Sequence, residues 1–353
     1  MAGSLANRYV VSIRRTGFGD RIICLCAAWR FARNTGRTLL ADWRYSGYSS
    51  AVTKNLFPLC FQSPPMLAGV RFIGDDTVAR VRLPRPRHPA IWENETLIHF
   101  PFLRPTATLL AERDAAVVLI RTGDDVAAPT VIFDACINDG IISLAEARRF
   151  LDALRPVPHI AAHVVAFRDT HLRPGPAIGL HVRHGNGGDT GHASYWASFD
   201  AAIARCQRAI DMARAEIGSD AVVLLCTDSS DVQRALAERV PGVLWRNKLF
   251  RNPGEGELHL WHEASLGRDD AMVELLLLAE CDALIRYPPG SFFSFYSAVM
   301  KPSRVPPAET LYDLQLPCDP DDAFAPALLA VTVIRRLERR DSFRLRLPDS
   351  GWR

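Results

Sequence analysis

The sequence has no segment that is typical of a secreted or membrane-spanning protein. Its first 15 residues contain no long apolar run and lead into a strand-like segment, so we expect neither a signal peptide nor an anchor. The most apolar stretch near the C-terminus, residues 323–334, is too short to cross a bilayer and precedes a group of arginines. We expect it to pack against the body of the protein, with weak attachment to a membrane surface as the alternative. These absences favour a cytoplasmic bacterial protein.

The sequence also lacks a strong net charge and paired cysteines. With 42 Lys and Arg against 39 Asp and Glu, the net charge of +3 provides no broad field for binding a nucleic acid. An anionic ligand must therefore be bound by a local group of residues. The 8 cysteines form no CxxC pair and lie mostly in apolar segments, so we expect reduced core thiols rather than zinc ligands or disulfides.

Two phosphate- and metal-binding motifs are missing. There is no P-loop GKS or GKT, and no Asp-x-Asp pair follows a strand of the first half, where many metal-dependent transferases place their carboxylates. The adjacent aspartates at 75–76, 124–125 and 269–270 are typical of turns and helix starts. The sequence therefore predicts no metal requirement and no other cofactor.

The length of 353 residues is sufficient for two domains, each with its own core. The first half opens with a strand, a glycine loop (RRTGFGDR) and a helix-patterned run. The predicted elements there are strands at 9–13, 38–43, 117–121 and 131–133 and a helix at 22–34. The Pro- and Arg-rich stretch VRLPRPRHP between them is typical of a surface loop.

The second half alternates strands and helices more regularly, which predicts a parallel sheet covered by helices. The predicted elements are strands at 177–183, 221–227, 243–246 and 283–287 and helices at 195–217, 231–240, 269–280 and 292–300, with a polar loop at 247–267. We therefore expect an α/β protein with two Rossmann-like domains facing each other across a cleft, the GT-B-like architecture. The predicted boundaries are 1–170, 171–320, and a C-terminal helix and basic tail at 321–353.

Ligands of open parallel sheets bind beyond the carboxyl ends of the strands. There the second half has His181-Val182-Arg183-His184, followed by a glycine-rich loop whose backbone amides can approach an anion closely. The guanidinium of Arg183 can bind a diphosphate with two parallel hydrogen bonds. The alternatives are an interdomain salt bridge for Arg183 and a structural hydrogen bond for His184.

Four segments carry a family resemblance. IGLHVRHGNGGD (178–189), LLCTDSSDV (224–232), DDAMVELLLLAECDALIRYPPGSFFSFYSAVM (269–300) and RRTGFGDRIICLCAAWRFARNTGRTLLADWR (14–44) resemble motifs of the NodZ-type nodulation α-1,6-fucosyltransferases. The histidine at position 184 resembles the bacterial branch, because the eukaryotic relatives carry arginine there. The Lys and Glu that follow in the eukaryotic loop have no clear counterpart in GNGGDTG, the loop of this chain at 185–191.

The resemblance implies roles for individual residues. Arg183 would bind the β-phosphate and stabilise departing GDP, His181 would contribute to the guanine side, and Glu274 would accept hydrogen bonds from guanine. Asp228 would orient His184 or Arg183. The implied donor-binding set is His181, Arg183, His184, Asn186, Asp228, Glu274, Gly290, Ser291 and Phe292.

The acceptor side and the general base are less well defined. Gly17 and Gly19 lie in a strand-to-helix loop that can approach substrate, although GFGD alone is a weak motif. Trp43 and Tyr45 offer aromatic faces for an acceptor sugar, with core packing as the alternative for Trp43. Asp189 is the candidate general base.

The implied reaction is an inverting transfer of L-fucose from GDP-β-L-fucose to the 6-hydroxyl of the reducing-end N-acetylglucosamine of a chitooligosaccharide or Nod factor. One alternative is a transferase that uses GDP-fucose or a related GDP-sugar in surface polysaccharide synthesis. The other is a catalytically silent protein that binds a sugar nucleotide or a carbohydrate.

Overall fold

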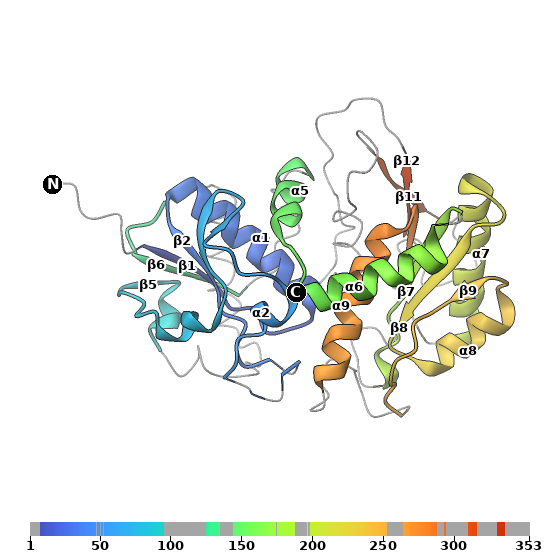
Figure 1. The fold of residues 1–353 in the computed structure, drawn as a ribbon, viewed down its shortest axis with the longest axis horizontal. Coiled ribbons are helices and arrows are strands. Elements are labelled where there is room, and N and C mark those ends of the chain that lie inside the picture. Colours follow the sequence, from blue (N-terminus) through green and yellow to red (C-terminus); the bar gives the residue numbers. More distant parts are fainter. Residues whose placement is uncertain are drawn as a thin grey trace. The chain divides into compact units, whose positions relative to one another are not determined.

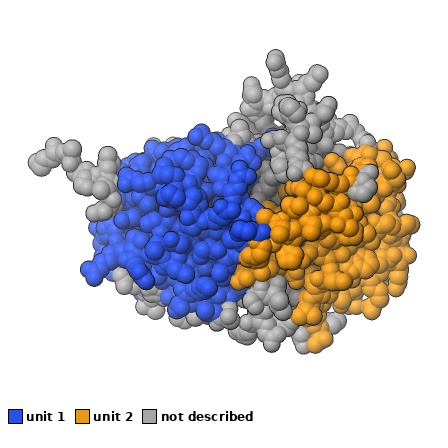
Figure 2. All heavy atoms as spheres, viewed as in Figure 1, with its two compact units in different colours: residues 1–158, 342–347 blue, residues 159–341, 348–353 orange. Residues whose placement is uncertain are grey.

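The chain forms two compact units in a computed structural model, one containing the described residues up to Pro158 and the other those from His159 on (Figure 2). The structure describes residues 8–46, 48, 49, 51, 53–94, 125–134, 144–173, 175–187, 196, 198–252, 264–287, 293, 310–315 and 330–335. The change between the units falls earlier in the chain than the boundary predicted at residue 170.

The first unit is built on a six-stranded sheet with the order β3-β4-β2-β1-β6-β5, parallel except for the β3–β4 pair (Figure 1). Its strands are β1 (Tyr9–Ser12), β2 (Thr38–Ala41), β3 (Met66–Leu67), β4 (Val70–Ile73), β5 (Arg87–His88) and β6 (Thr130–Phe133). Its helices are α1 (Phe18–Thr35), α2 (Phe57–Cys60) and α5 (Leu144–Ala153), with short 3-10 turns at Asp76–Arg80 and Ala90–Glu93.

The second unit has another six-stranded sheet, with the order β11-β12-β10-β7-β8-β9. Its strands are β7 (Ala177–Val182), β8 (Val222–Thr227), β9 (Val243–Leu244), β10 (Ala283–Tyr287), β11 (Thr310–Gln315) and β12 (Ala330–Arg335). Its helices are α6 (Pro158–Phe167), which continues into a π-helical turn at Arg168–Leu172, α7 (Phe199–Ile217), α8 (Ser230–Arg239) and α9 (Ala264–Glu280). The strands β7, β8, β9 and β10 are parallel, whereas β11 and β12 join antiparallel beside β10.

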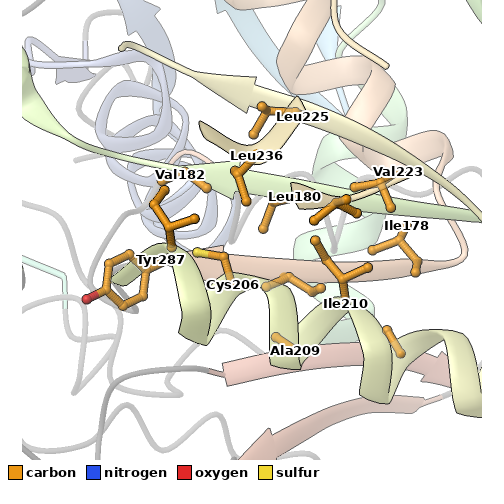
Figure 3. Close-up of a cluster of buried hydrophobic side chains, with 14 of the residues drawn as sticks. Ile178, Leu180, Val182, Cys206, Ala209, Ile210, Val223, Leu225, Leu236 and Tyr287 are labelled. Atoms are coloured by element: carbon orange, nitrogen blue, oxygen red, sulfur yellow. The ribbon is translucent and has the colours of Figure 1, made fainter. Parts of the chain in front are cut away.

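Helices lie on both faces of the second sheet, so its central strands are buried on both sides. Alternate residues of β7, such as Ile178 and Leu180, pack with α7 and α8 in a cluster that also contains Val223, Leu225 and Tyr287 (Figure 3). The intervening residue Gly179 faces Leu278 of α9. All six residues of β7 are buried, which explains why the strand is recognisable as a continuous apolar run.

The structure corrects several predicted elements. Helix α1 begins at Phe18, not at residue 22, and α9 begins at Ala264, inside the predicted polar loop. The Pro- and Arg-rich stretch contains β5, which pairs with β6. Residues 330–335 form strand β12 and not part of a C-terminal helix, because their β-branched run favours a pleated strand. The predicted strand at 117–121 and the aromatic helix at 292–300, apart from Phe293, lie outside the described residues.

The close approach of α9 to β7 depends on Gly179. A Cβ atom at this position would lie 2.9 Å from Cδ2 of Leu278 and 3.3 Å from both Sγ of Cys281 and Cδ1 of Leu284. We predict that Gly179→Ala lowers the free energy of unfolding by about 1–3 kcal/mol, because these side chains must shift. Chemical denaturation measures the change.

Gly175→Ala is the matched control, since no atom lies within 4 Å of a Cβ built there. We expect that substitution to change stability by about 0.5 kcal/mol or less. Equal losses in the two variants would show that the contact with α9 is not what requires glycine at position 179.

Candidate active site

Strands β7 and β10 are neighbours at the centre of the second sheet. The strand order reverses between them, because β8 and β9 follow on one side of β7 while β10 lies on its other side. This switch point is the usual ligand-binding position of an open parallel sheet. The strand β7 ends just before Arg183, whose backbone N–H donates to the carbonyl oxygen of Tyr287 at 2.7 Å. The candidate site therefore begins where these two strands separate.

Asp228, at the carboxyl end of β8, connects the polar groups of this edge. Its Oδ2 accepts hydrogen bonds from Nη1 of Arg183 at 2.8 Å and from the backbone N–H of Gly185 at 3.0 Å, and its Oδ1 accepts one from the backbone N–H of His184 at 2.8 Å. The predicted contact between Asp228 and Arg183 is thus present. This ion pair lies within the second unit.

The environment of Asp228 keeps the carboxylate ionised. Burial alone would raise the pKa of Asp228, but the guanidinium of Arg183 and the two backbone amides bring this pKa below its ordinary value. A carboxylate in this state is a strong hydrogen-bond acceptor and a weak base. Asp228 is therefore suited to hold Arg183 in place and not to remove a proton from an acceptor hydroxyl.

The loop after β7 is fixed by Asn186, a buried residue with a left-handed backbone (φ 49°). Its Nδ2 donates to the carbonyl oxygens of Arg251 at 3.4 Å and Asn252 at 2.8 Å. In this structure the side-chain amide therefore ties the loop after β7 to the segment after β9. Its predicted contact with the donor stays a prediction.

His184 packs its ring edge-on against the indole of Trp196, with ring centroids 4.6 Å apart and planes at 86°. Burial lowers the pKa of His184. The indole N–H of Trp196 donates to the carbonyl oxygen of Arg183 at 3.1 Å. In this structure the ring of His184 therefore packs against Trp196, and its predicted contact with the donor stays a prediction.

His181 and Glu274 lie on the α9 side of the sheet. His181 is buried, and its ring centroid lies 5.1 Å from that of Phe293. Nζ of Lys248 contacts both carboxylate oxygens of Glu274, at 2.7 and 2.8 Å. Burial raises the pKa of Glu274, and the ammonium of Lys248 limits that rise.

The predicted acceptor residues belong to the first unit. Trp43 is fully buried and packs edge-on against Phe57, with ring centroids 5.2 Å apart, so it is a core residue and offers no face to a sugar here.

Tyr45 has a φ of 57°, and its ring centroid lies 5.6 Å from the guanidinium carbons of both Arg15 and Arg44. Gly17 caps α1, where a Cβ atom would meet nothing within 4 Å, and Gly19 is buried in the first turn.

Four predicted site residues cannot be placed. Asp189, Gly290, Ser291 and Phe292 lie outside the described residues, so their roles stay predictions. Among the residues that the structure does describe, no group of three or more His, Cys, Asp or Glu side chains is placed to hold a metal ion. Within the same part of the chain, no helix is long and apolar enough to cross a membrane.

Sequence reasoning missed three residues of the site: Lys248, Trp196 and Arg286. Arg286 pairs in register with His181 across the β10–β7 ladder and is 5% exposed. Lys248 is one of only three lysines in a chain whose basic residues are otherwise arginines, which is the signal that could have drawn attention to it. No motif points to Trp196.

Comparison with known proteins identifies the family. The model of the nodulation protein Z (NodZ) family matches residues 6–316. The chain belongs to the NodZ family. It is 40% identical over 304 residues to nodulation protein Z of Bradyrhizobium diazoefficiens, covering 86% of this chain and 81% of that protein. It is 41% identical over 298 residues to the protein of Sinorhizobium fredii, covering 84% and 92%.

Solved structures support the same assignment. The crystal structure of NodZ α-1,6-fucosyltransferase co-crystallised with GDP has a TM-score of 0.70 and 31% identity, covering 84% of this chain and 93% of that one. The same values apply to NodZ soaked with GDP-fucose. The family resemblance and the GT-B-like α/β fold predicted from the sequence are both confirmed.

The burial of His181 leads to a pH-dependent prediction for this NodZ-family protein. Burial lowers the pKa of His181 to about 3 from an ordinary value of 6.5, with Arg183, Lys248 and Arg286 acting in the same direction and Asp228 opposing them. Below pH 6.5 the imidazole of His181 therefore binds a proton in the unfolded chain but not in the folded chain. As a result, the free energy of unfolding falls as the pH drops from 6.5 towards 3. We predict that His181→Asn flattens this fall by up to about 1.4 kcal/mol per pH unit.

Urea unfolding at several pH values between 7 and 5 measures the effect. The matched control is His163→Asn on an exposed position of α6, which should leave the pH dependence of the wild type intact. A His181→Asn protein with the wild-type slope would contradict a buried, neutral imidazole.

Proposed function

We propose that this chain is a GDP-fucose-dependent α-1,6-fucosyltransferase that acts on N-acetylglucosamine at the reducing end of a chitooligosaccharide or Nod factor. The donor assignment follows from the NodZ structures with GDP and GDP-fucose. The acceptor, the inverting stereochemistry, the metal independence and a bacterial cytosolic location are the finer parts of this proposal. Family membership and the local geometry of the second unit support it together.

The observation that carries the proposal is the position of Arg183. Its side chain is only 17% exposed, is held by Asp228 and stands at the carboxyl end of β7, beside Gly185 and the left-handed Asn186. A preoriented cation of this kind can bind a diphosphate and stabilise the negative charge that develops as the glycosidic bond breaks. This is the role that a metal ion has in other transferases.

The acceptor hydroxyl also needs a base. Asp228 and Glu274 are poorly suited, because each carboxylate already accepts hydrogen bonds from a cation that holds it in place. Asp189 remains the proposed base. In the sequence it follows the glycine-rich run 185–188, and it lies within the segment that resembles a motif of the family. Gly290, Ser291 and Phe292 are proposed to complete the phosphate side.

The reaction itself is tested by measuring GDP released from GDP-fucose with and without a chitooligosaccharide. We predict release that depends on the acceptor and persists in excess EDTA. GDP binding without release would indicate a catalytically silent sugar-nucleotide-binding protein. Release restored only by added manganese or magnesium would mean that Arg183 is not the main stabiliser of the leaving group.

The role of Arg183 is tested by Arg183→Lys. Lysine keeps the charge but cannot form two parallel hydrogen bonds to a diphosphate, so we predict that turnover falls about a hundredfold or more. Arg239→Lys is the matched control, because Arg239 also pairs with an aspartate, Asp200 at 2.6 Å, but on the surface of α8. Near-normal turnover of a folded Arg183→Lys protein would remove Arg183 from the mechanism.

A further inference from the structure

Lys248 and Glu274 form a buried ion pair on the α9 side of the second sheet. Their side chains are 7% and 8% exposed, and Nζ of Lys248 donates to both carboxylate oxygens. Taking two charges out of water is costly, and such a pair often stabilises the fold less than apolar side chains would. A contribution to stability alone therefore does not explain why this pair is buried here.

The groups around the pair come from several elements. His181 of β7 stands in register with Cys226 of β8 on one side and Arg286 of β10 on the other, so all three side chains are on one face of the sheet. That face is opposite to the one that packs on α7 and α8, and α9 covers it.

Charged and titratable groups near Glu274 also come from the segment after β9 and from α9 itself. Arg246 reaches Asp270 of α9 at 3.2 Å. Burial raises the pKa of the Cys226 thiol well above its ordinary value, and the charge of Glu274 adds to the rise, so the thiol stays neutral beside it. Because His181 is neutral as well, Lys248 is, among the residues that the structure describes, the charged group that contacts Glu274 directly and compensates its negative charge.

A carboxylate has lone pairs for about four hydrogen bonds, and the two oxygens of Glu274 each accept one from Lys248. Further acceptor positions on the same oxygens are thus left for other donors. Guanine presents two adjacent donors, its ring N1–H and its 2-amino group, whereas hypoxanthine keeps only the first and adenine lacks both.

We propose that Lys248 is a positioning residue for base recognition, which keeps the buried carboxylate of Glu274 ionised and oriented so that it accepts both donors of guanine. The inference rests on the proposed use of GDP-fucose and adds a specificity-determining residue to it. Without the ammonium, burial favours the protonated acid, and a protonated Glu274 presents a donor where guanine also has donors. The opposite possibility is that Lys248 competes with the base and must leave before guanine binds.

The experiment is calorimetric titration of GDP and IDP between pH 5 and 8.5. For Lys248→Met we expect the Kd for GDP to rise about tenfold or more at pH 6, and the midpoint of the Kd–pH curve to move up by about one pH unit or more. Lys248→Arg should keep both the Kd at pH 6 and the midpoint close to those of the wild type, because arginine also supplies a charged donor. Lys54→Met, on the exposed surface of the first unit, is the matched control for loss of a lysine and should bind GDP as the wild type does.

Two further variants separate the pair from a general loss of stability. Lys248→Gln removes the charge but keeps a donor for Glu274, and should shift the midpoint in the same direction even if Lys248→Met folds poorly. In a Glu274→Gln background the pH dependence and the preference for GDP over IDP should be weakened, and Lys248→Met should add no further midpoint shift.

The outcomes are distinct. If Lys248→Met and Lys248→Gln bind GDP as tightly as the wild type, or more tightly, at every pH, Lys248 is a competitor or a structural residue and the inference is wrong. In that case the proposed function stands, because the wild type still binds GDP. If the wild type itself fails to bind GDP, the proposed function fails first and the inference falls with it.

Discussion

The candidate site depends on the hydrogen bonds that the carboxylate of Asp228 accepts. This carboxylate lies at the end of a buried strand and accepts hydrogen bonds from the guanidinium of Arg183 and from two backbone amides of the loop after β7. One side chain thereby sets both the direction of the cation and the course of the loop. Because these donors satisfy the carboxylate, it can remain ionised despite its burial.

The polar residues of the candidate site lie at two places along the second sheet, one beyond the strand ends and one within the sheet. Arg183 and Asp228 stand just beyond the strand ends, where a phosphate group could be bound. His181, Arg286 and the Lys248–Glu274 pair lie deeper, on the α9 side. Gly179 allows α9 to lie close to β7, so a residue without a side chain sets the distance between the helix that carries Glu274 and the strand that carries His181.

Much of this fold could be predicted because its central strands are buried on both faces. The segments that became β7, β8 and β10 are continuous apolar runs, and their polar ends fall at the switch point. The start of α1 was missed because its N-cap, Gly17, makes no side-chain hydrogen bond and so leaves no capping signal. The short strand β5 depends on pairing with β6, a long-range contact that its Pro-rich sequence does not indicate.

The site was predictable only in part, for a similar reason. Arg183 and Asp228 each follow a strand, so their proximity could be deduced from the parallel order of the sheet. The contact between Lys248 and Glu274 joins an irregular segment to the middle of a helix and follows no periodicity. Trp43 was open to two interpretations because an aromatic residue after a strand suits either a core or a sugar-binding surface, and only its burial decides between them.

Asn186 has a consequence for how related sequences can vary. Its backbone is left-handed, which glycine, asparagine and aspartate adopt most readily, while its side-chain N–H groups reach two carbonyl oxygens of the segment that follows β9. Glycine would meet the first demand without the second, and aspartate would place an acceptor against acceptors. Asparagine alone among these residues satisfies both, so the residue at this one position is a marker of whether a homologue keeps its two loops joined.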